Sequence, residues 1–580
     1  MVGFFDFVVV CCLLRIFNTK SFMKTTHCFV FALSTLLTGL SAEPPKLVLQ
    51  ITVDQLRGDQ LTRFADRMPD GGFQYFLDEG INYANAHHSH ANTETIVGHA
   101  TLATGATPSV HGMVANVWFD RETGQTTYNI EDPNYALLTE GADVDAANEI
   151  DPTQRAANTD GRSPRAMLSS TFSDELALRT AGQSKVFGVS VKDRGAVSMA
   201  GHAGKAFWFS KAAGQFVTST YYYDAYPEWV TAWNAADPLA RYAGQAWTLS
   251  QDPETYQFGD RDDQPWETAM PGFGRTFPHS YGDADSRGFT TYLTLSPAGD
   301  QITLEFAKAL IANESIGQDE VTDYLAVSFS STDYVGHIFG PSSLEAEDNL
   351  LQLDRTIAAL LEYVDDVVGL DDTLIVLSAD HGGPEAPGSL QQYGFDVNYV
   401  EPDTWDKAPA FERLKERFGI GEELIETYEH PYVYLNQSVL SEQGIDQAEV
   451  EQAVAEELTK FAGVALAVSS KALARGETSD TPVYRAVVNN YHLKRSGDVY
   501  VVFEPQWFIA DFDGLHVACT HGSPWRYDTY VPIIFAGADL EAQTIHREVH
   551  TVDLAPTLSA YLGLQAPSGS VGAVLTEVME

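Results

Sequence analysis

The sequence has 580 residues, of which 44% are hydrophobic, and its 80 acidic and 35 basic side chains give a formal net charge of −45 at pH 7. This length predicts either one large domain with insertions or two to three domains, and the hydrophobic content is that of a globular protein. The excess of carboxylates argues against nucleic acid as a surface-bound partner, because phosphate backbones are bound by Lys and Arg.

The start of the chain predicts a leader over residues 1–42 that the mature protein lacks. From Met23 the sequence reads MKTTHCFVFALSTLLTGLSAEPPK, in which a lysine precedes an apolar run of signal-peptide length and small residues follow. We expect cleavage after Ser41 or Ala42, with Met23 as an alternative start of translation. Residues 43–580 contain no further apolar run of about 18 residues, so we expect a secreted or periplasmic bacterial protein without a membrane span.

Residues 1–22 are also apolar, and they are either an upstream, misassigned start or part of an anchor. The leader holds Cys11, Cys12 and Cys28, so that only Cys519 remains after its removal. An internal disulfide is then impossible, and we expect Cys519 to be a small buried residue.

Short apolar runs rich in β-branched residues recur along the chain, for example KLVLQITVD, KVFGVSVKDR, DYLAVSFSSTD, DDTLIVLSADH and YVPIIFAG. Such runs predict buried parallel strands, and a helical pattern over 344–368 lies between two of them. Alternating strands and helices predict an α/β fold, a mostly parallel central sheet flanked by helices. Chemistry gathers at the carboxyl ends of such strands. The polar residues at these positions are Asp54, Lys192, Arg194, Asp333, Asp380 and His381.

Two long stretches interrupt the alternation of strands and helices. Residues from about 197 to 295 are rich in Tyr, Trp, Gly, Asp and Pro, whereas residues from about 385 to 510 have strand and helix patterns of their own. We predict that both are insertions into a single catalytic domain, 43–580, and that they form a cap over the carboxyl edge of the sheet.

Aspartate and histidine cluster at several separate strand ends. The candidate metal ligands are Asp54, Asp333, His337, Asp380, His381 and His521. Imidazole and carboxylate together favour Zn²⁺ over Ca²⁺ or Mg²⁺. Six ligands exceed what one tetrahedral zinc with an open position accepts, and they suit two zinc ions with three protein ligands each.

The stretch ANTETIVGHATLATGATPSVHG, 91–112, has few bulky side chains and predicts a helix N-terminus that something must approach closely. Amide N–H groups and the helix dipole favour an anion at such an end. Thr95 is the predicted nucleophile and Thr93 its rival, unless both hydroxyls only cap the helix. A metal pair lowers the pKa of an oxygen in contact with it, which suits a threonine nucleophile.

In combination, several motifs resemble the alkaline phosphatase superfamily and, within it, the PafA-like alkaline phosphatases, which are related to the nucleotide pyrophosphatase/phosphodiesterases. The motifs are TVDQLRGD at 52–59, TETIVGHATLATGATPSVHG at 93–112, NVWFD at 116–120, VKDRGA at 191–196, STDYVGHIFGP at 331–341, SADHGG at 378–383 and THGSPWRYDTYVPIIFAG at 520–537. The resemblance covers nearly all of the chain after the leader.

The resemblance implies how the candidate residues divide between two zinc ions. One zinc would be held by Asp333, His337 and His521, and the other by Asp54, Asp380, His381 and the Thr95 oxygen. It also implies that Thr95 is the nucleophile and that Asn116, Lys192 and Arg194 bind the phosphoryl group. An amide, an ammonium and a guanidinium are donors that suit non-bridging phosphate oxygens.

These features predict a two-zinc alkaline phosphatase that hydrolyses small-molecule phosphate monoesters through a phosphothreonine intermediate. A phosphodiesterase or nucleotide pyrophosphatase on the same core is the first alternative. The second is a non-catalytic, zinc-stabilised binding protein that uses the cap as a lectin-like surface. The three are distinguished by activity on monoesters and diesters, measured together with metal content.

Overall fold

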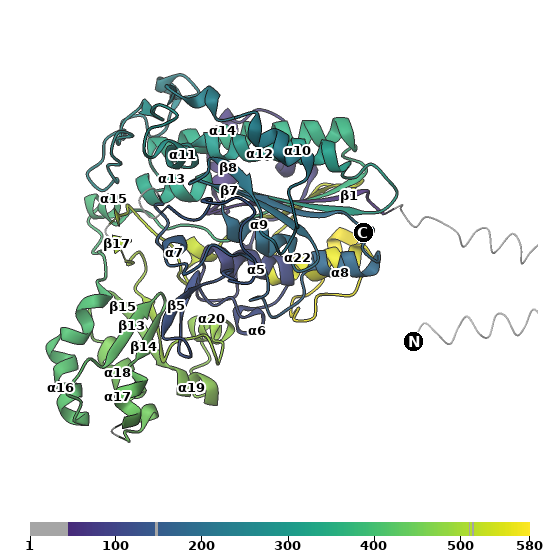
Figure 1. Ribbon diagram of the computed structural model, residues 1–580. Coiled ribbons are helices and arrows are strands. Elements are labelled where there is room, and N and C mark those ends of the chain that lie inside the picture. The colour runs from purple at the N-terminus through teal and green to yellow at the C-terminus, as the bar shows by residue number, and fades with distance from the viewer. Residues whose placement is uncertain (1–43, 146–148, 443, 510, 513–514, 580) are drawn as a thin grey trace, which may run out of the picture. The chain divides into compact units, whose positions relative to one another are not determined.

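In the computed structural model, the part of the chain that the structure describes covers residues 44–145, 149–442, 444–509, 511–512 and 515–579. The predicted leader and its three cysteines lie outside these residues. Nine described strands form one sheet at the centre of Figure 1. In spatial order they are β20 (Gln543–Ile545), β2 (Ile81–Tyr83), β19 (Ile533–Gly537), β12 (Thr373–Ser378), β1 (Leu47–Val53), β11 (Asp323–Phe329), β6 (Val186–Ser190), β7 (Lys205–Ser210) and β8 (Gln215–Val217).

The middle of this sheet is parallel, as the apolar runs predict. The five adjacent strands from β12 to β7 all run in the same direction. At the end of β1, Val53 lies opposite Phe329 of β11, and Thr52 lies opposite Ser378 of β12. The residues that follow β12, β1 and β11 therefore emerge side by side at the carboxyl edge of the sheet.

The strand β19 differs from the prediction, because it pairs antiparallel with β12. The reason lies in the chain order around it. His521 comes before β19 and not after it, so the strand starts at the edge where the other strands end and runs away from it. The α/β fold with a mostly parallel sheet is confirmed, and this strand is its exception in the central region.

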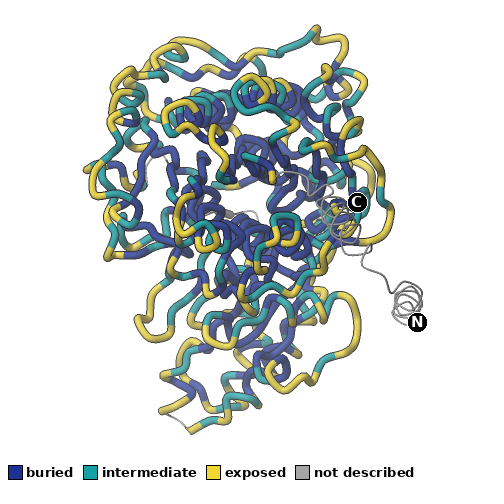
Figure 2. The backbone as a smooth tube through the Cα atoms, turned by 90° about the vertical axis from the view of Figure 1, so that its right-hand side faces the viewer, coloured by how far each residue is buried: buried dark blue, intermediate teal, exposed yellow. Residues whose placement is uncertain are grey.

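Helices cover both faces of the sheet (Figure 1). One layer contains α11 (Phe289–Thr294), α12 (Pro297–Glu314), α13 (Ser331–Phe339) and α14 (Leu344–Val367), and the other contains α5 (Thr95–Thr104), α8 (Phe172–Arg179), α9 (Asp193–Ala200) and α22 (Leu554–Tyr561). Alternate residues of β1 face the two helix layers. Leu49 and Ile51 belong to the apolar core with α12 and α14, and Val48 belongs to the core with α5 and α22. Figure 2 shows the buried backbone concentrated in these layers.

The range 385–510 contains a second, four-stranded antiparallel sheet, which is drawn in green in Figure 1. Its strands are β13 (Ile425–Glu429), β14 (Tyr432–Leu435), β16 (Val499–Phe503) and β15 (Val464–Ser469), and the helices α16 (Pro409–Phe418) and α18 (Gln447–Leu458) pack against it. Tyr428, Glu429 and His430 line the cavity at the carboxyl edge of the central sheet. These three residues bring this segment to the cavity, and its role as a cap stays a prediction.

The range 197–295 lies elsewhere than predicted. Its first part supplies β7 and β8, which extend the central sheet, and no residue of this range is among the described residues that line the cavity. Its aromatic side chains pack against the helix layer instead: Trp233 meets Phe306 of α12 edge-on, with ring centroids 5.1 Å apart. The predicted cap is therefore corrected here, because aromatic side chains of this range pack into the core, as Phe216 does, or against it, as Trp233 does, and do not line the cavity.

Among the described helices, none combines the length and the apolar composition that crossing a membrane requires.

Candidate active site and metal centre

Three neighbouring strands place aspartates side by side at the carboxyl edge. Asp54 directly follows β1, Asp380 follows β12, and Asp333 lies in the first turn of α13, which begins just after β11. The three strands are adjacent and in register, so these carboxylates meet although they are far apart in the sequence. His337 follows Asp333 by one helical turn, His381 follows Asp380, and His521 arrives on the loop before β19.

Asp54, Asp380 and His381 form a first group, which we call the buried triad; their ligand atoms all lie within 4.8 Å of one another. The Nε2 atom of His381 lies 3.4 Å from Asp54 Oδ1 and 3.4 Å from Asp380 Oδ2. All three side chains are 0% exposed. The Nδ1 of His381 is engaged by the carbonyl oxygen of Gly382 at 2.9 Å, which leaves Nε2 directed at the carboxylates.

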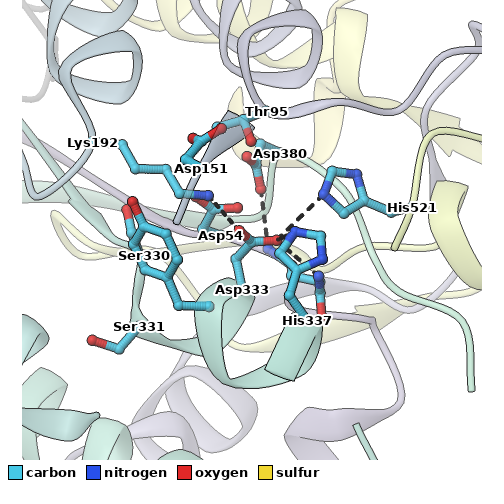
Figure 3. A network of polar contacts seen from close by, with 12 residues as sticks. Asp54, Thr95, Asp151, Lys192, Ser330, Ser331, Asp333, His337, Asp380 and His521 are labelled. Atoms are coloured by element: carbon cyan, nitrogen blue, oxygen red, sulfur yellow. Dashed lines mark hydrogen bonds and ion pairs between the residues drawn. The ribbon is translucent and has the colours of Figure 1, made fainter. Parts of the chain in front are cut away.

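Asp333, His337 and His521 form a second group, which we call the open triad and which satisfies the same distance limit. Asp333 Oδ1 lies 3.2 Å from His337 Nε2 and 3.3 Å from His521 Nε2, as the dashed lines in Figure 3 show. Each Nδ1 contacts a backbone carbonyl oxygen, that of Cys519 at 2.9 Å for His337 and that of Thr93 at 2.8 Å for His521. Such contacts fix ring orientation, as they do for metal-binding histidines.

The buried polar atoms of the buried triad fit a cation. Asp54 Oδ1 and His381 Nε2 are buried and make no hydrogen bond of good geometry. Asp54 Oδ2 lies 2.7 Å from the Lys192 ammonium, and Asp380 Oδ2 lies 3.1 Å from His99 Nδ1. Burial raises the pKa of Asp380, and the Asp54 carboxylate raises it further. Burial lowers the pKa of His381, but Asp380 and Asp54 together raise it to about 9. Carboxylate and imidazole are both zinc ligands, and a bound cation would satisfy these atoms.

The open triad has a different electrostatic setting. Burial and the neighbouring His381, whose ring is stacked 3.6 Å away, lower the pKa of His521 to about 3. The Nε2 of His521 is therefore a free lone pair at neutral pH, as metal ligation requires. The stacked rings bring the two triads next to each other, which is the arrangement that a pair of metal ions needs.

Lys192 lies between the two triads. It follows β6 at the N-cap of α9, and its Nζ is 2.7 Å from Asp54 Oδ2 and 2.5 Å from Asp333 Oδ2 (Figure 3). Burial raises the pKa of Asp54, but Lys192 and His381 lower it to about 2. Lys192 is not among the described residues that line the cavity, so in this structure its ammonium pairs with predicted metal ligands.

Thr95 occupies the first position of α5, and the structure distinguishes it from Thr93. The Thr95 Oγ1 accepts a hydrogen bond from Arg194 Nη2 at 3.2 Å, and Thr95 lines the cavity. Thr93 Oγ1 instead donates to the carbonyl oxygen of Ser523 at 3.0 Å, and Thr93 is not among the described lining residues. This placement favours Thr95 as the nucleophile.

The helix α5 lies very close to the loop that carries Asp380. A Cβ added at Gly98 would lie 1.8 Å from the Asp380 carbonyl oxygen, so a residue other than glycine would force the helix away. Asn116 faces the same helix end, where its Oδ1 accepts a hydrogen bond from Ile96 N at 3.1 Å. The small residues of 91–112 thus let the loop that carries Asp380 approach α5 closely, as the sequence predicts.

The site opens into a cavity of about 670 Å³. Thr95, Asn116, Arg194 and the open triad are among the residues that line it. The lining also includes apolar and aromatic side chains from several segments, which are Val117, Ile150, Pro152, Tyr428, Phe508, Ile509, Leu515 and Val517.

Three residues at the site were missed by the sequence analysis. Asp151 accepts a hydrogen bond from Arg194 Nη1 at 2.7 Å, and Glu94 accepts one from the backbone N–H of Asn116 at 2.7 Å. Gln55 donates to Asp333 Oδ1 at 2.8 Å. Asp151 precedes a proline at the start of a short helix, and this pattern indicates a helix cap rather than a site. Only tertiary contacts mark these three residues.

Cys519 is buried, and its thiol donates to the carbonyl oxygen of Gly336 at 3.1 Å. The structure thus gathers every predicted ligand and Thr95, Asn116, Lys192 and Arg194 at one edge of the sheet. The roles of these residues stay predictions.

Comparisons with known proteins agree with this geometry. A family model described as type I phosphodiesterase / nucleotide pyrophosphatase matches residues 48–524. A Myroides odoratus protein named calcium-transporting ATPase is 34% identical over 97% of this chain and 100% of its own length. Alkaline phosphatase PafA of Elizabethkingia meningoseptica is 34% identical over 92% of this chain and 94% of its own. The crystal structure of wild-type alkaline phosphatase PafA superimposes with a TM-score of 0.85 and 32% identity, covering 93% of this chain and all of that one.

Proposed function

As the chain belongs to the type I phosphodiesterase / nucleotide pyrophosphatase family, in its branch of PafA-like alkaline phosphatases, we propose that it is a two-zinc phosphomonoesterase. It hydrolyses phosphate monoesters through a phosphothreonine on Thr95. The observation that carries this proposal is the position of the Thr95 hydroxyl, on a helix N-terminus that faces the cavity and within hydrogen-bond distance of Arg194.

The open triad would hold one zinc, and the buried triad, with the Thr95 oxygen, would hold the other. When bound, the two ions supply positive charge at the site and lower the pKa of the oxygens that contact them. The protein itself orients the reactants. The N-terminal N–H groups of α5 favour the phosphoryl anion, and Arg194 donates to its non-bridging oxygens as Asp151 holds the guanidinium in place.

The reaction balances in two displacements. Thr95 Oγ attacks phosphorus in line, the bond between phosphorus and the alcohol oxygen breaks, and the threonine proton ends on that oxygen. Water then attacks the phosphothreonine, breaks the bond between phosphorus and Oγ, and releases inorganic phosphate. The leaving alcohol occupies the part of the cavity that apolar and aromatic side chains line.

A monoester has three non-bridging oxygens, and a diester has one of these positions blocked by its second alcohol group. Asn116, Lys192 and Arg194 are the proposed partners of these oxygens, which favours the monoester. The terminal phosphoryl group of ATP also has three non-bridging oxygens, so ATP belongs among the substrates tested, given the name of the Myroides odoratus relative. From the predicted leader we propose a periplasmic or secreted location.

The test of this function is to trap the intermediate on the zinc-loaded protein. Incubation with a labelled monoester, an acid quench and mapping of the labelled peptide should place phosphate on Thr95. Thr95→Ala should abolish turnover and keep the fold, whereas Thr93→Ala, the matched control, should retain most of the activity. Label on Thr93, or turnover by Thr95→Ala, would contradict the nucleophile assignment. Absence of turnover by the zinc-loaded wild type would favour the non-catalytic binding protein.

A further inference from the structure

Gln55 directly follows the predicted ligand Asp54, and its backbone is in a conformation that glutamine disfavours. Its φ is +66°, in the left-handed region, where the Cβ crowds the backbone. The residue lies in the tight turn after β1, in which the Leu56 N–H donates to the Val53 carbonyl oxygen at 3.3 Å. A strained residue persists only where surrounding contacts hold it, and such residues concentrate at functional sites.

The contacts that hold Gln55 reach one carboxylate in each triad. Its backbone N–H donates to Asp380 Oδ1 of the buried triad at 3.2 Å. Its side-chain Nε2 donates to Asp333 Oδ1 of the open triad at 2.8 Å. Gln55 is 3% exposed, so both hydrogen bonds lie away from solvent. With the left-handed backbone, the N–H of Gln55 points to Asp380 and its side chain to Asp333.

The amide of Gln55 also lies against the helix that carries the open triad. A Cβ added at Gly336 of α13 would lie 1.9 Å from Gln55 Oε1. Glycine at this position lets the helix approach the amide, one residue before His337. The Gln55 side chain therefore fills the space between the turn after β1 and Gly336 of α13.

We propose that Gln55 is a positioning residue that couples the two triads and sets the spacing of the two zinc sites. The inference rests on the proposed two-zinc function. A neutral amide suits this task, because Lys192 already brings one positive charge to Asp333, and the amide adds a donor without a second charge that would compete with zinc. The outer contacts of metal-binding carboxylates orient them, and losing such a contact lowers metal affinity about 10–100-fold.

The variant Gln55→Gly tests this proposal, because it removes the amide and relaxes the backbone at the same time. We expect a folded protein with thermal stability close to that of the wild type. The zinc affinity of the open triad, whose Asp333 loses the amide donor, should fall about 10–100-fold. Competition with a chromophoric chelator measures the affinity. In the cobalt-substituted protein, the visible absorption bands, which report ligand geometry, should shift. Gln55→Glu places a carboxylate opposite Asp333 and should alter the same two measurements.

Two further variants keep the test decisive. Gln55→Asn retains tolerance for the left-handed backbone but has a shorter side chain, so it replaces Gln55→Gly if that variant fails to fold, with the same expected result. Gln50→Ala is the matched control: Gln50 is buried on β1, accepts a hydrogen bond from Tyr324 at 2.8 Å, and should affect stability without changing zinc affinity.

Unchanged zinc affinities and cobalt spectra in the folded Gln55 variants, with a wild type that binds two zinc ions, would overturn this inference alone. A wild type that binds fewer than two zinc ions or has no phosphatase activity would instead overturn the proposed function.

Discussion

The buried and open triads contain the same residue types, but the protein surrounds them differently. All three side chains of the buried triad are 0% exposed, whereas His337 of the open triad is 14% exposed. Asp333, His337 and His521 all line the cavity, and no member of the buried triad is among the described lining residues. On the proposed function, the open triad would meet an incoming ester directly, and the buried triad would act through Thr95.

The two triads also differ in how their charges are balanced. Asp333 has hydrogen-bond partners in Gln55 and Lys192, so its carboxylate is partly satisfied without a metal ion. In the buried triad, Lys192 also pairs with Asp54, but Asp380 Oδ2 and His381 Nε2, 3.4 Å apart, are buried and make no hydrogen bond of good geometry. Because buried polar atoms without good hydrogen bonds are destabilising, we expect the buried triad to depend more on its cation. Four predictions test this contrast.

Asp380→Ala should have the largest effect. It removes a ligand from the buried triad, so the zinc content should fall from two ions to about one. The kcat/KM for a monoester should fall more than about 10³-fold, because a catalytic metal contributes several kcal/mol. Elemental analysis and phosphate release measure the two quantities. Asp372→Ala is the control, since Asp372 pairs with Lys46 and is 48% exposed. Full zinc content in Asp380→Ala would contradict the assignment.

His337→Ala should have a smaller and reversible effect. This ligand lies on the cavity side, so added zinc can reach the open triad and be held by Asp333 and His521. We expect activity to fall about 10²-fold without added metal and to recover in part with excess zinc. Titration of kcat against zinc measures the recovery, and exposed His516→Ala is the control. If excess zinc does not restore the activity of His337→Ala, the proposed functional difference between the triads is wrong.

Arg194→Ala should affect the ester without affecting either triad. A charge-assisted hydrogen bond contributes roughly 1.5–3 kcal/mol, so kcat/KM for a monoester should fall by about one to two decades. The diester activity should fall less, and zinc content should remain at two. The double variant Lys192→Ala/Arg194→Ala should lower the ratio of monoester to diester kcat/KM further. Arg165→Ala is the control, because Arg165 is exposed. Equal losses for both esters would favour the phosphodiesterase alternative.

Glu577→Gln should have the smallest effect and provides a reference for a partly exposed charge pair. A hydrogen bond from Arg547 lowers the pKa of Glu577 from 4.5 to about 2. The pair therefore stabilises the fold above pH 4.5, and this contribution is lost as the pH falls toward 2. We expect the free energy of unfolding at pH 7 to fall by at most about 1 kcal/mol. Zinc content at pH 7 should not change.

Urea unfolding of wild type and Glu577→Gln at pH 7, 5 and 3 measures this effect. The difference between the two proteins should shrink as the pH falls. A difference that stays constant with pH would mean that Glu577 does not act through its charge.

The sequence by itself determined the fold class and the predicted ligands. Apolar, β-branched runs predict strands wherever they occur, because such side chains suit a sheet buried on both faces. A polar residue directly after such a run, as at Asp54 or Asp380, then lies at the carboxyl edge of a parallel sheet. The motif resemblance assigns these residues and Thr95 to a catalytic site, and the structure places them together.

Tertiary structure alone decided which triad is buried, which residues support the site, and where the range 197–295 lies. Asp151 and Gln55 have no local pattern that marks them, since their partners Arg194, Asp333 and Asp380 are far away along the chain. Local patterns encode the short-range preference for strand, helix or turn. Burial and the pairing of charges depend on what packs against each side chain, which is known only once distant segments have met.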